Sequence, residues 1–216
     1  MDGNMSEKEQ IESLKKWWDE NASSLVIGVF LGLSVLLGGK AWISWKDTQA
    51  QNSSNIYAQM QSALKQNDVE MARSQANDLI GNYTDSGYAT LAALMLAKLA
   101  MQDGELVAAR SQLEWAAEHA RTAQVANIAR SRLVRVLIDE KEYTQADAVL
   151  SQVVDADEYR HIFAELQGDL AFSQGEMERA AAAYRDALAV LPAQASNAAY
   201  LRVKYENLAG ADALPQ

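Results

Sequence analysis

The chain has 216 residues, of which 49% are hydrophobic, and 19 lysines and arginines stand against 29 acids for a net charge of −10. Nucleic-acid binding needs a basic face that displaces counterions, and no basic cluster occurs in the sequence, so we expect no nucleic-acid partner. The chain has no cysteine, which excludes thiol nucleophiles and thiolate metal sites. Abundant alanine and leucine, with two prolines, favour an all-α fold.

An uncharged, mostly apolar stretch runs from residue 21 to residue 39. About twenty such residues let an α-helix cross the hydrocarbon core of a bilayer. Lys40 follows, but near a helix end its ammonium can reach the headgroups, so the predicted transmembrane helix covers 21–46. Tryptophans flank both ends, as in aromatic belts: Trp17, Trp18, Trp42 and Trp45. A cleaved signal peptide is the alternative, but the long apolar run and the acidic start favour a retained anchor.

The lysines on the two sides of the span predict its orientation. Three precede it and two follow it: Lys8, Lys15, Lys16, Lys40 and Lys46. Because the more basic flank stays in the cytoplasm, we expect a single-pass, type II protein of a bacterial inner membrane. Residues 1–20 would form a cytoplasmic tail and residues 47–209 a periplasmic domain, followed by a loose tail at 210–216. A cytoplasmic body is the alternative.

Three small residues recur every fourth position inside the span, Ser24, Gly28 and Gly32. Small side chains at this spacing allow two helices to approach closely in lipid. The same pattern also occurs in membrane helices without a partner. These residues are therefore candidates for a contact with another transmembrane helix.

The body of the chain contains an internal repeat. One alanine recurs at steps of 37, 37 and 34 residues, at Ala72, Ala109, Ala146 and Ala180. A period of this length predicts stacked helix pairs that share a continuous core. We expect pairs at about 54–80, 88–118, 125–153 and 159–190, and a capping helix at about 195–208.

The last unit gives the repeat its identity. Gly168, Ala180, Tyr184, Ala187 and Pro192 fall at spacings that resemble the tetratricopeptide repeat, a 34-residue helix–turn–helix. The glycine and the first alanine are small enough to let paired helices approach, and the proline ends the second helix. The earlier units are more degenerate at the glycine position, with Met60, Ala97 and Val134. The predicted body is thus a tetratricopeptide-like α-solenoid of about four helix pairs plus a capping helix, with a generic antiparallel bundle as the alternative.

The sequence offers no constellation for catalysis. His119 and His161 lie in different units, without a second histidine or a glutamate at metal-ligand spacing. Phosphate-cradling glycine loops and the G-x-S-x-G elbow are absent from the sequence. We therefore expect a protein that is not an enzyme and has no cofactor or metal.

Helix-pair solenoids bind partners along a face lined mainly by the first helix of each pair. Aliphatic, methionine and aromatic side chains mixed with a few charges suit an adaptable surface for protein segments. The candidates for this face are Tyr57, Leu64, Leu94, Lys98, Met101, Arg135, Ile138, Glu165, Asp169 and Phe172. Leucines and methionines at these spacings are also typical of a helical core, so the two interpretations compete at each position.

The chain resembles the YfgM family, the ancillary subunit of the bacterial SecYEG translocon. The most specific segments are QIESLKKWWDEN (10–21), VIGVFLG (26–32), the Arg130-Ser131-Arg132-Leu133-x-x-Val136 helix and AELQGDLAFSQGE (164–176). The resemblance implies an inner-membrane anchor with a periplasmic tetratricopeptide-like domain, partnered by SecYEG and by the membrane-bound periplasmic chaperone PpiD. It further implies help in passing newly translocated client proteins to periplasmic chaperones, and a link to the Rcs envelope-stress response.

The residues themselves support a tethered protein-binding adaptor, because an anchor raises the effective concentration of a weak binder at the membrane. Two alternatives stay open. One is a scaffold for another envelope complex, which would hold one stable partner. The other is a regulatory adaptor, for example in an envelope stress response. A regulatory adaptor that faces the cytoplasm would require the opposite topology.

Overall fold

The computed structural model describes residues 7–153 and 157–209, and within these ranges the regular structure is helical. The expected all-α class is confirmed. The chain divides into two compact units, residues 1–52 and 53–216. Residues 1–6 of the predicted N-terminal tail and the whole predicted C-terminal tail, 210–216, lie outside the described residues.

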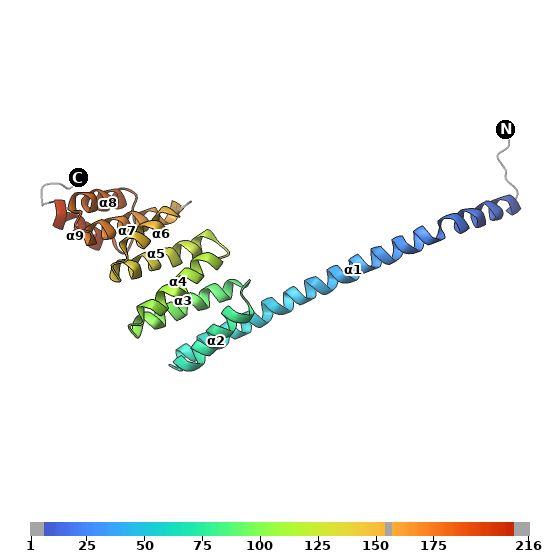
Figure 1. Cartoon of the computed structure of the whole chain (residues 1–216), viewed down its shortest axis with the longest axis horizontal. Helices are drawn as coiled ribbons and strands as arrows, with labels where there is room; N and C mark the ends of the chain where they lie inside the picture. Colours follow the sequence, from blue (N-terminus) through green and yellow to red (C-terminus); the bar gives the residue numbers. More distant parts are fainter. Residues whose placement is uncertain (1–6, 154–156, 210–216) are drawn as a thin grey trace, which may run out of the picture. The chain divides into compact units, whose positions relative to one another are not determined.

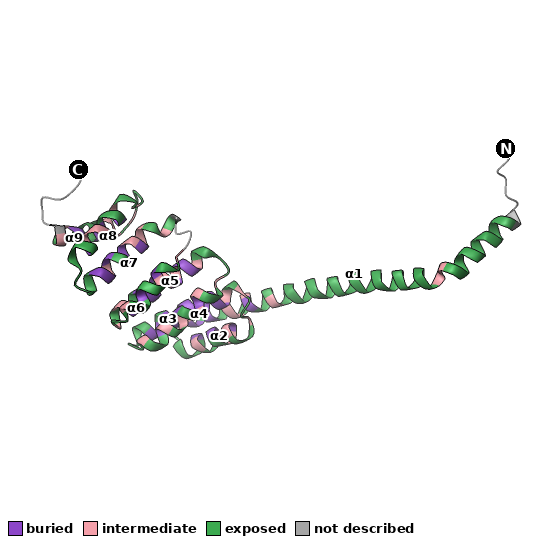
Figure 2. Cartoon of the chain, turned by 45° about the horizontal axis from the view of Figure 1, so that its top comes forward, coloured by how far each residue is buried: buried purple, intermediate pink, exposed green. Residues whose placement is uncertain are grey.

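The first unit is formed by helix α1 (Glu7–Lys65) as far as residue 52. Among the described residues α1 is the one helix long and apolar enough to cross a membrane, and the side chains of its apolar window are exposed (Figure 2). The hydroxyl of Ser34 donates to the carbonyl oxygen of Phe30, 2.8 Å away, so this polar group is satisfied within the helix, as lipid requires. The polar stretch 49–55 is helical as well.

The second unit begins with the end of α1 and continues as a series of antiparallel helices (Figure 1). The helices are α2 (Val69–Asn82), α3 (Gly87–Gln102), α4 (Leu106–His119), α5 (Ala123–Asp139), α6 (Tyr143–Ser151), α7 (Arg160–Ser173), α8 (Met177–Ala189) and α9 (Ala198–Ala209), with a short 3₁₀ turn before α7. Each packs on its neighbours: α3 on α4, α4 on α5, α7 on α8 and α8 on α9. These elements match the four predicted pairs and the capping helix.

The repeat positions coincide with the core. The four recurring alanines (72, 109, 146 and 180) are each at most 1% exposed. The residues at the glycine position are buried too: Met60, Ala97, Val134 and Gly168. The three larger ones fill the space with side chain, whereas at Gly168 the ring of Tyr184 occupies it. The glycine position is therefore buried in each pair, and in the last pair it leaves room for the Tyr184 ring.

The turn between the helices of each pair repeats with the same period. One residue in each turn has a positive φ: Asn67 (58°), Gly104 (79°), Lys141 (62°) and Gly175 (81°). An acid follows each of them and stands at the N-cap of the second helix: Asp68, Glu105, Glu142 and Glu176. An acidic side chain there opposes the positive end of the helix dipole, so turn and cap are set by the same dipeptide.

Lys141 is the turn residue least suited to its backbone, because a side chain with a Cβ atom is disfavoured at positive φ. We expect Lys141→Gly to stabilise the domain by about 0.5–1 kcal/mol, after allowing for the added freedom of glycine in the unfolded chain. Gly104→Ala should have the opposite sign. Urea denaturation midpoints of both variants test this, and a destabilised Lys141→Gly variant would contradict the assigned turn conformation.

Ion pairs link the second helix of each of the first three pairs to the next repeat. Arg73 pairs with Asp103 at 2.5 Å, and Arg110 pairs with Glu140 at 3.3 Å, 37 residues further on. In the next interface the charges are reversed, since Asp147 faces Arg179 at 3.9 Å. The Arg73–Asp103 and Asp147–Arg179 pairs each include a side chain that is more than half exposed, and such pairs contribute about 0–1 kcal/mol each. Arg110 and Glu140 are less exposed, at 27% and 14%.

Candidate protein-binding face

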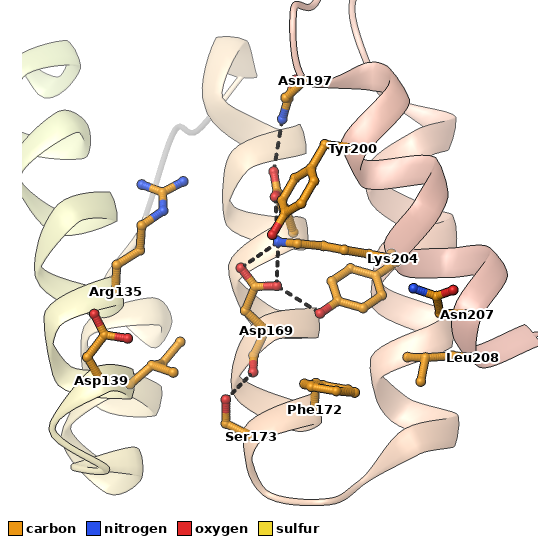
Figure 3. A pocket seen from close by; sticks show the side chains of 13 residues that line it. Arg135, Asp139, Asp169, Phe172, Ser173, Asn197, Tyr200, Lys204, Asn207 and Leu208 are labelled. Carbon is orange, nitrogen blue, oxygen red and sulfur yellow. Dashed lines mark hydrogen bonds and ion pairs between the residues drawn. The ribbon is translucent and has the colours of Figure 1, made fainter.

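A hollow of about 620 Å³ lies at the end of the solenoid, between α5, α7 and α9 (Figure 3). It is lined by Arg135, Ile138, Asp139, Glu165, Asp169, Phe172, Ser173, Tyr184, Asn197, Tyr200, Lys204, Asn207 and Leu208. Helices α5 and α7 are the first helices of the third and fourth pairs, and α9 is the capping helix. The cap therefore forms one wall of the hollow as well as closing the core.

Lys204 of α9 is the centre of a polar cluster that ties the cap to α7. Its Nζ atom lies 2.8 Å from Glu165 Oε1 and 2.7 Å from Asp169 Oδ1. Asn197 donates to Glu165 Oε2 at 2.9 Å, and the Tyr184 hydroxyl donates to Asp169 Oδ1 at 2.8 Å. Figure 3 shows the bonds of the ammonium to the two carboxylates, and the bonds of Asn197 and Tyr184 to the same carboxylates. The two carboxylates are thereby neutralised in part and held in one orientation.

Aromatic rings complete the environment of this ammonium. Its nitrogen lies 4.7 Å from the ring centroid of Tyr200 and 5.6 Å from that of Tyr184. Such contacts attract a cation through the ring quadrupole. Two carboxylates and two rings thus favour the charged form of a side chain that is only 17% exposed.

The cluster shifts two pKa values upward. Burial opposes protonation of Lys204, but its bonds to Asp169 and Glu165 outweigh this and raise the pKa of the ammonium. The pKa of Tyr184 is raised by burial first and then by its hydrogen bond to the Asp169 carboxylate. Both groups therefore stay protonated at neutral pH, and the cluster acts as a fixed structural link rather than a proton donor or acceptor.

Other side chains of the hollow remain open to a ligand. Phe172 and Tyr200 are 50% and 63% exposed. The guanidinium of Arg135 donates to the carbonyl oxygen of Ser131 at 3.3 Å on its own helix, and no carboxylate pairs with it among the described ion pairs. Asp139 stands one turn further along α5. The hollow thus offers apolar contact beside one charge of each sign, which suits side chains of a polypeptide.

Five of the residues predicted for the binding face meet in this hollow: Arg135, Ile138, Glu165, Asp169 and Phe172. Lys98 and Met101 are exposed on α3. Tyr57 and Leu64 are half-buried against the core of the first pair, and the ring of Tyr57 contacts that of Tyr88 in a tilted arrangement, with 5.0 Å between the ring centroids. Leu94 is 7% exposed within the central core, so it offers almost no surface to a partner.

The register of the repeat explains this distribution. Leu64, Met101, Ile138 and Phe172 occupy one position in successive first helices, at steps of 37, 37 and 34 residues. Three residues earlier lies a polar row of Gln61, Lys98, Arg135 and Asp169. Residues three apart on a helix are neighbours, so an apolar row runs beside a polar one from repeat to repeat.

The capping helix lines the hollow, which the sequence did not predict. Asn197, Tyr200 and Lys204 line the hollow, although the segment was interpreted only as a cap. Tyr200 and Lys204 are four residues apart and so lie on the same side of α9. The next residues after each, Leu201 and Tyr205, are buried. One side of α9 thus packs in the core, through Leu201 and Tyr205, and the adjacent side lines the hollow, through Tyr200 and Lys204.

The small residues of the span are not among the residues that line this hollow. Ser24, Gly28 and Gly32 belong to the first unit and are exposed. A Cβ atom at either glycine would meet no atom of the chain within 4 Å. This leaves their surface accessible, and their contact with another membrane helix stays a prediction.

Comparison with known proteins is consistent with the repeat and the anchor. The tetratricopeptide repeat-like domain family matches residues 15–210. The chain belongs to this family. Because the match starts before the span and ends one residue after α9, the family relationship includes both units.

Among curated relatives, the ancillary SecYEG translocon subunit of Escherichia coli K12 is 27% identical over 83% of this chain and 85% of its own length. Those of Aggregatibacter actinomycetemcomitans and Neisseria gonorrhoeae are 25% and 24% identical, over 85% and 96% of this chain and 89% and 100% of their own. The predicted resemblance to this group of proteins is confirmed.

Proposed function

We propose that this chain is a membrane-tethered, non-enzymatic protein-binding adaptor associated with the SecYEG translocon. The observation that carries the proposal is the similarity, over 83–96% of the chain, to proteins named ancillary SecYEG translocon subunit. The adaptor would help to pass newly translocated proteins to periplasmic chaperones such as a PpiD-like, membrane-anchored chaperone. The tetratricopeptide repeat-like family supports binding rather than catalysis as the role of the domain.

The anchor determines where this adaptor acts. The apolar helix fits a membrane-anchored protein, and the excess of lysines before the span favours a cytoplasmic N-terminus. The solenoid, residues 47–209, would then lie in the periplasm. Ser24, Gly28 and Gly32 would form the surface that packs on a membrane helix of the translocon or of its partner chaperone.

The mechanism we infer is capture by a weak site at high local concentration. The hollow between α5, α7 and α9 presents Phe172 and Ile138 for apolar contact and Arg135 and Asp139 for polar contact. A site of this size accommodates a few side chains, which gives modest affinity. Tethering beside the exit of a translocon compensates for the modest affinity, because it raises the effective concentration of the binding site near the emerging chain.

Photocrosslinking in living cells tests the proposed surface. A photoreactive amino acid placed at Phe172 or Met101 should capture SecYEG subunits, the partner chaperone or translocating chains. Val107 provides the matched control, because it is 67% exposed but stands on the second helix of its pair. Equal capture from all three positions would contradict a specific binding face.

A reporter fused to the C-terminus decides the topology separately. Activity of a periplasm-specific reporter such as alkaline phosphatase is the expected result. A reporter active only in the cytoplasm would overturn the periplasmic assignment, even if translocon subunits were captured.

A further inference from the structure

Helix α1 carries a second apolar surface that precedes the membrane span. Ile11, Leu14, Trp17 and Trp18 are 57%, 66%, 47% and 51% exposed. They stand in the described first turns of the helix, ahead of the uncharged stretch that starts at Asn21. We call these four residues the N-terminal stripe. No core residue of the described chain packs against it.

The stripe is one-sided. At 3.6 residues per turn its four members fall within an arc of about 120°. Glu12, Lys16 and Asp19 lie on the other side of the helix, as their spacing from Ile11 requires. A helix with one apolar and one charged side is suited to the boundary between water and hydrocarbon.

Distance shows that the stripe is not simply the end of the span. Ile11 is ten residues before Asn21, which corresponds to about 15 Å along a helix. The headgroup layer on one side of a bilayer is only about 5–8 Å thick. A helix standing upright in the membrane would therefore place Ile11 and Leu14 in water, where their apolar surface is unfavourable.

The helix has a point at which its direction can change. Figure 2 shows α1 bending next to a turn of intermediate burial near its N-terminal end, where Asn21 and Ala22 have this burial. The amide of Asn21 donates to the carbonyl oxygen of Trp17, 2.9 Å away. A side chain that joins the backbone ladder in this way is a recognised cause of helix bending.

We infer that residues 9–20 form an amphipathic foot that lies in the membrane interface, with the N-terminal stripe in the boundary between headgroups and acyl chains. The partner is the lipid surface itself, because the same helix continues into an apolar span and the tryptophans stand at the junction. Tryptophan prefers this boundary. The opposite side carries acids as well as lysine and so has no basic cluster for anionic lipid, and we expect apolar burial and the helix's own anchor to hold the foot.

This inference does not rest on translocon association or on the orientation of the span. The cysteine-free chain allows single spin labels to be introduced into the full-length protein. Ile11→Cys and Leu14→Cys place labels in the stripe, and Glu12→Cys and Lys16→Cys place them on the opposite side. Each labelled protein is reconstituted into vesicles of zwitterionic phosphatidylcholine, and its accessibility to oxygen and to a water-soluble nickel chelate is measured.

The stripe labels should be several-fold less accessible to nickel than the two control labels, and more accessible to oxygen. Raising the salt concentration should leave this difference unchanged. Four labels with equal access to nickel would overturn the inference. Protection of the stripe that appears only when SecYEG is reconstituted in the same vesicles would also overturn it, because the partner would then be a protein.

Discussion

Replacing Lys204 with methionine is expected to lower the stability of the C-terminal repeat by about 2–4 kcal/mol. The change removes the one cation that faces Glu165 and Asp169 in the described cluster. Glu165 is 7% exposed, so its carboxylate would be left in a poorly hydrated site without a counter-charge. Such a loss costs more than the pair contributes, because the remaining charge keeps its desolvation penalty.

The effect should be local, since each repeat of a solenoid contacts mainly its neighbours. Hydrogen exchange should accelerate in α9 and at the end of α7, and remain unchanged in α3 and α4. Arg179→Met is the matched control, because Arg179 and its partner Asp147 are 59% and 66% exposed and their pair contributes about 0–1 kcal/mol. Equal destabilisation by both variants would contradict the proposed role of burial.

A second test is Glu165→Gln in the Lys204→Met background. Removing the orphaned charge should recover part of the lost stability, which a merely steric role of Lys204 would not allow. The recovery has a functional consequence as well. If α9 returns to its place, the hollow regains its third wall, and crosslinking from Phe172 should recover with it.

Gly168→Ala is expected to destabilise the last repeat by about 1–3 kcal/mol, although alanine is the better helix former. A Cβ atom at this position would overlap the ring of Tyr184. That ring is held from the other end by the bond between its hydroxyl and Asp169. Relief of the clash would therefore have to move the tyrosine out of the seam or break its hydrogen bond.

Gly81→Ala is the matched control for this prediction. Gly81 is also helical, in α2, but a Cβ atom there would meet nothing within 4 Å. The control should be neutral or stabilise by up to about 1 kcal/mol. Denaturation midpoints of the two variants make the comparison, and a tolerated Gly168→Ala would show that the helices of the last pair can separate without loss.

The substitutions at Lys204 and Gly168 affect the same small group of contacts. Gly168 admits the Tyr184 ring, the hydroxyl of Tyr184 fixes Asp169, and Asp169 shares Lys204 with Glu165. Packing of the last pair and the position of α9 are thus linked through one chain of contacts. The hollow that we propose as a protein-binding site depends on both.

The repeat and the anchor could be predicted because their signals are local and periodic. A run of about twenty uncharged residues is sufficient for a membrane helix, and small residues at 37, 37 and 34 residues mark the seams of helix pairs. The turn dipeptides at residues 67–68, 104–105, 141–142 and 175–176 repeat with the same period. Each such signal can be read along the chain without knowing which distant residues come into contact.

The protein-binding face stays a prediction, and the hollow contains only some of the residues predicted for it. Arg135, Asp169 and Phe172 line the hollow as their helix positions indicated, because the register of a first helix fixes which side leaves the seam. Leu94 was placed on the same face but lies in the core. The residues at the same position of the next two first helices, Ser131 and Glu165, are 6% and 5% exposed. Packing therefore covers this position of the register, which a pattern of apolar residues does not reveal.

By itself, the sequence determined that this protein has an apolar helix long enough to anchor it, a repeat of helix pairs and no cysteine chemistry. Only the tertiary structure decided that Lys204 neutralises Glu165 and Asp169, and that α9 forms a wall of the hollow. The reason is distance along the chain. The 3.6-residue periodicity of a helix reports contacts between residues three or four apart. Lys204 and its partners are 35–39 residues apart and meet only when the cap packs on α7.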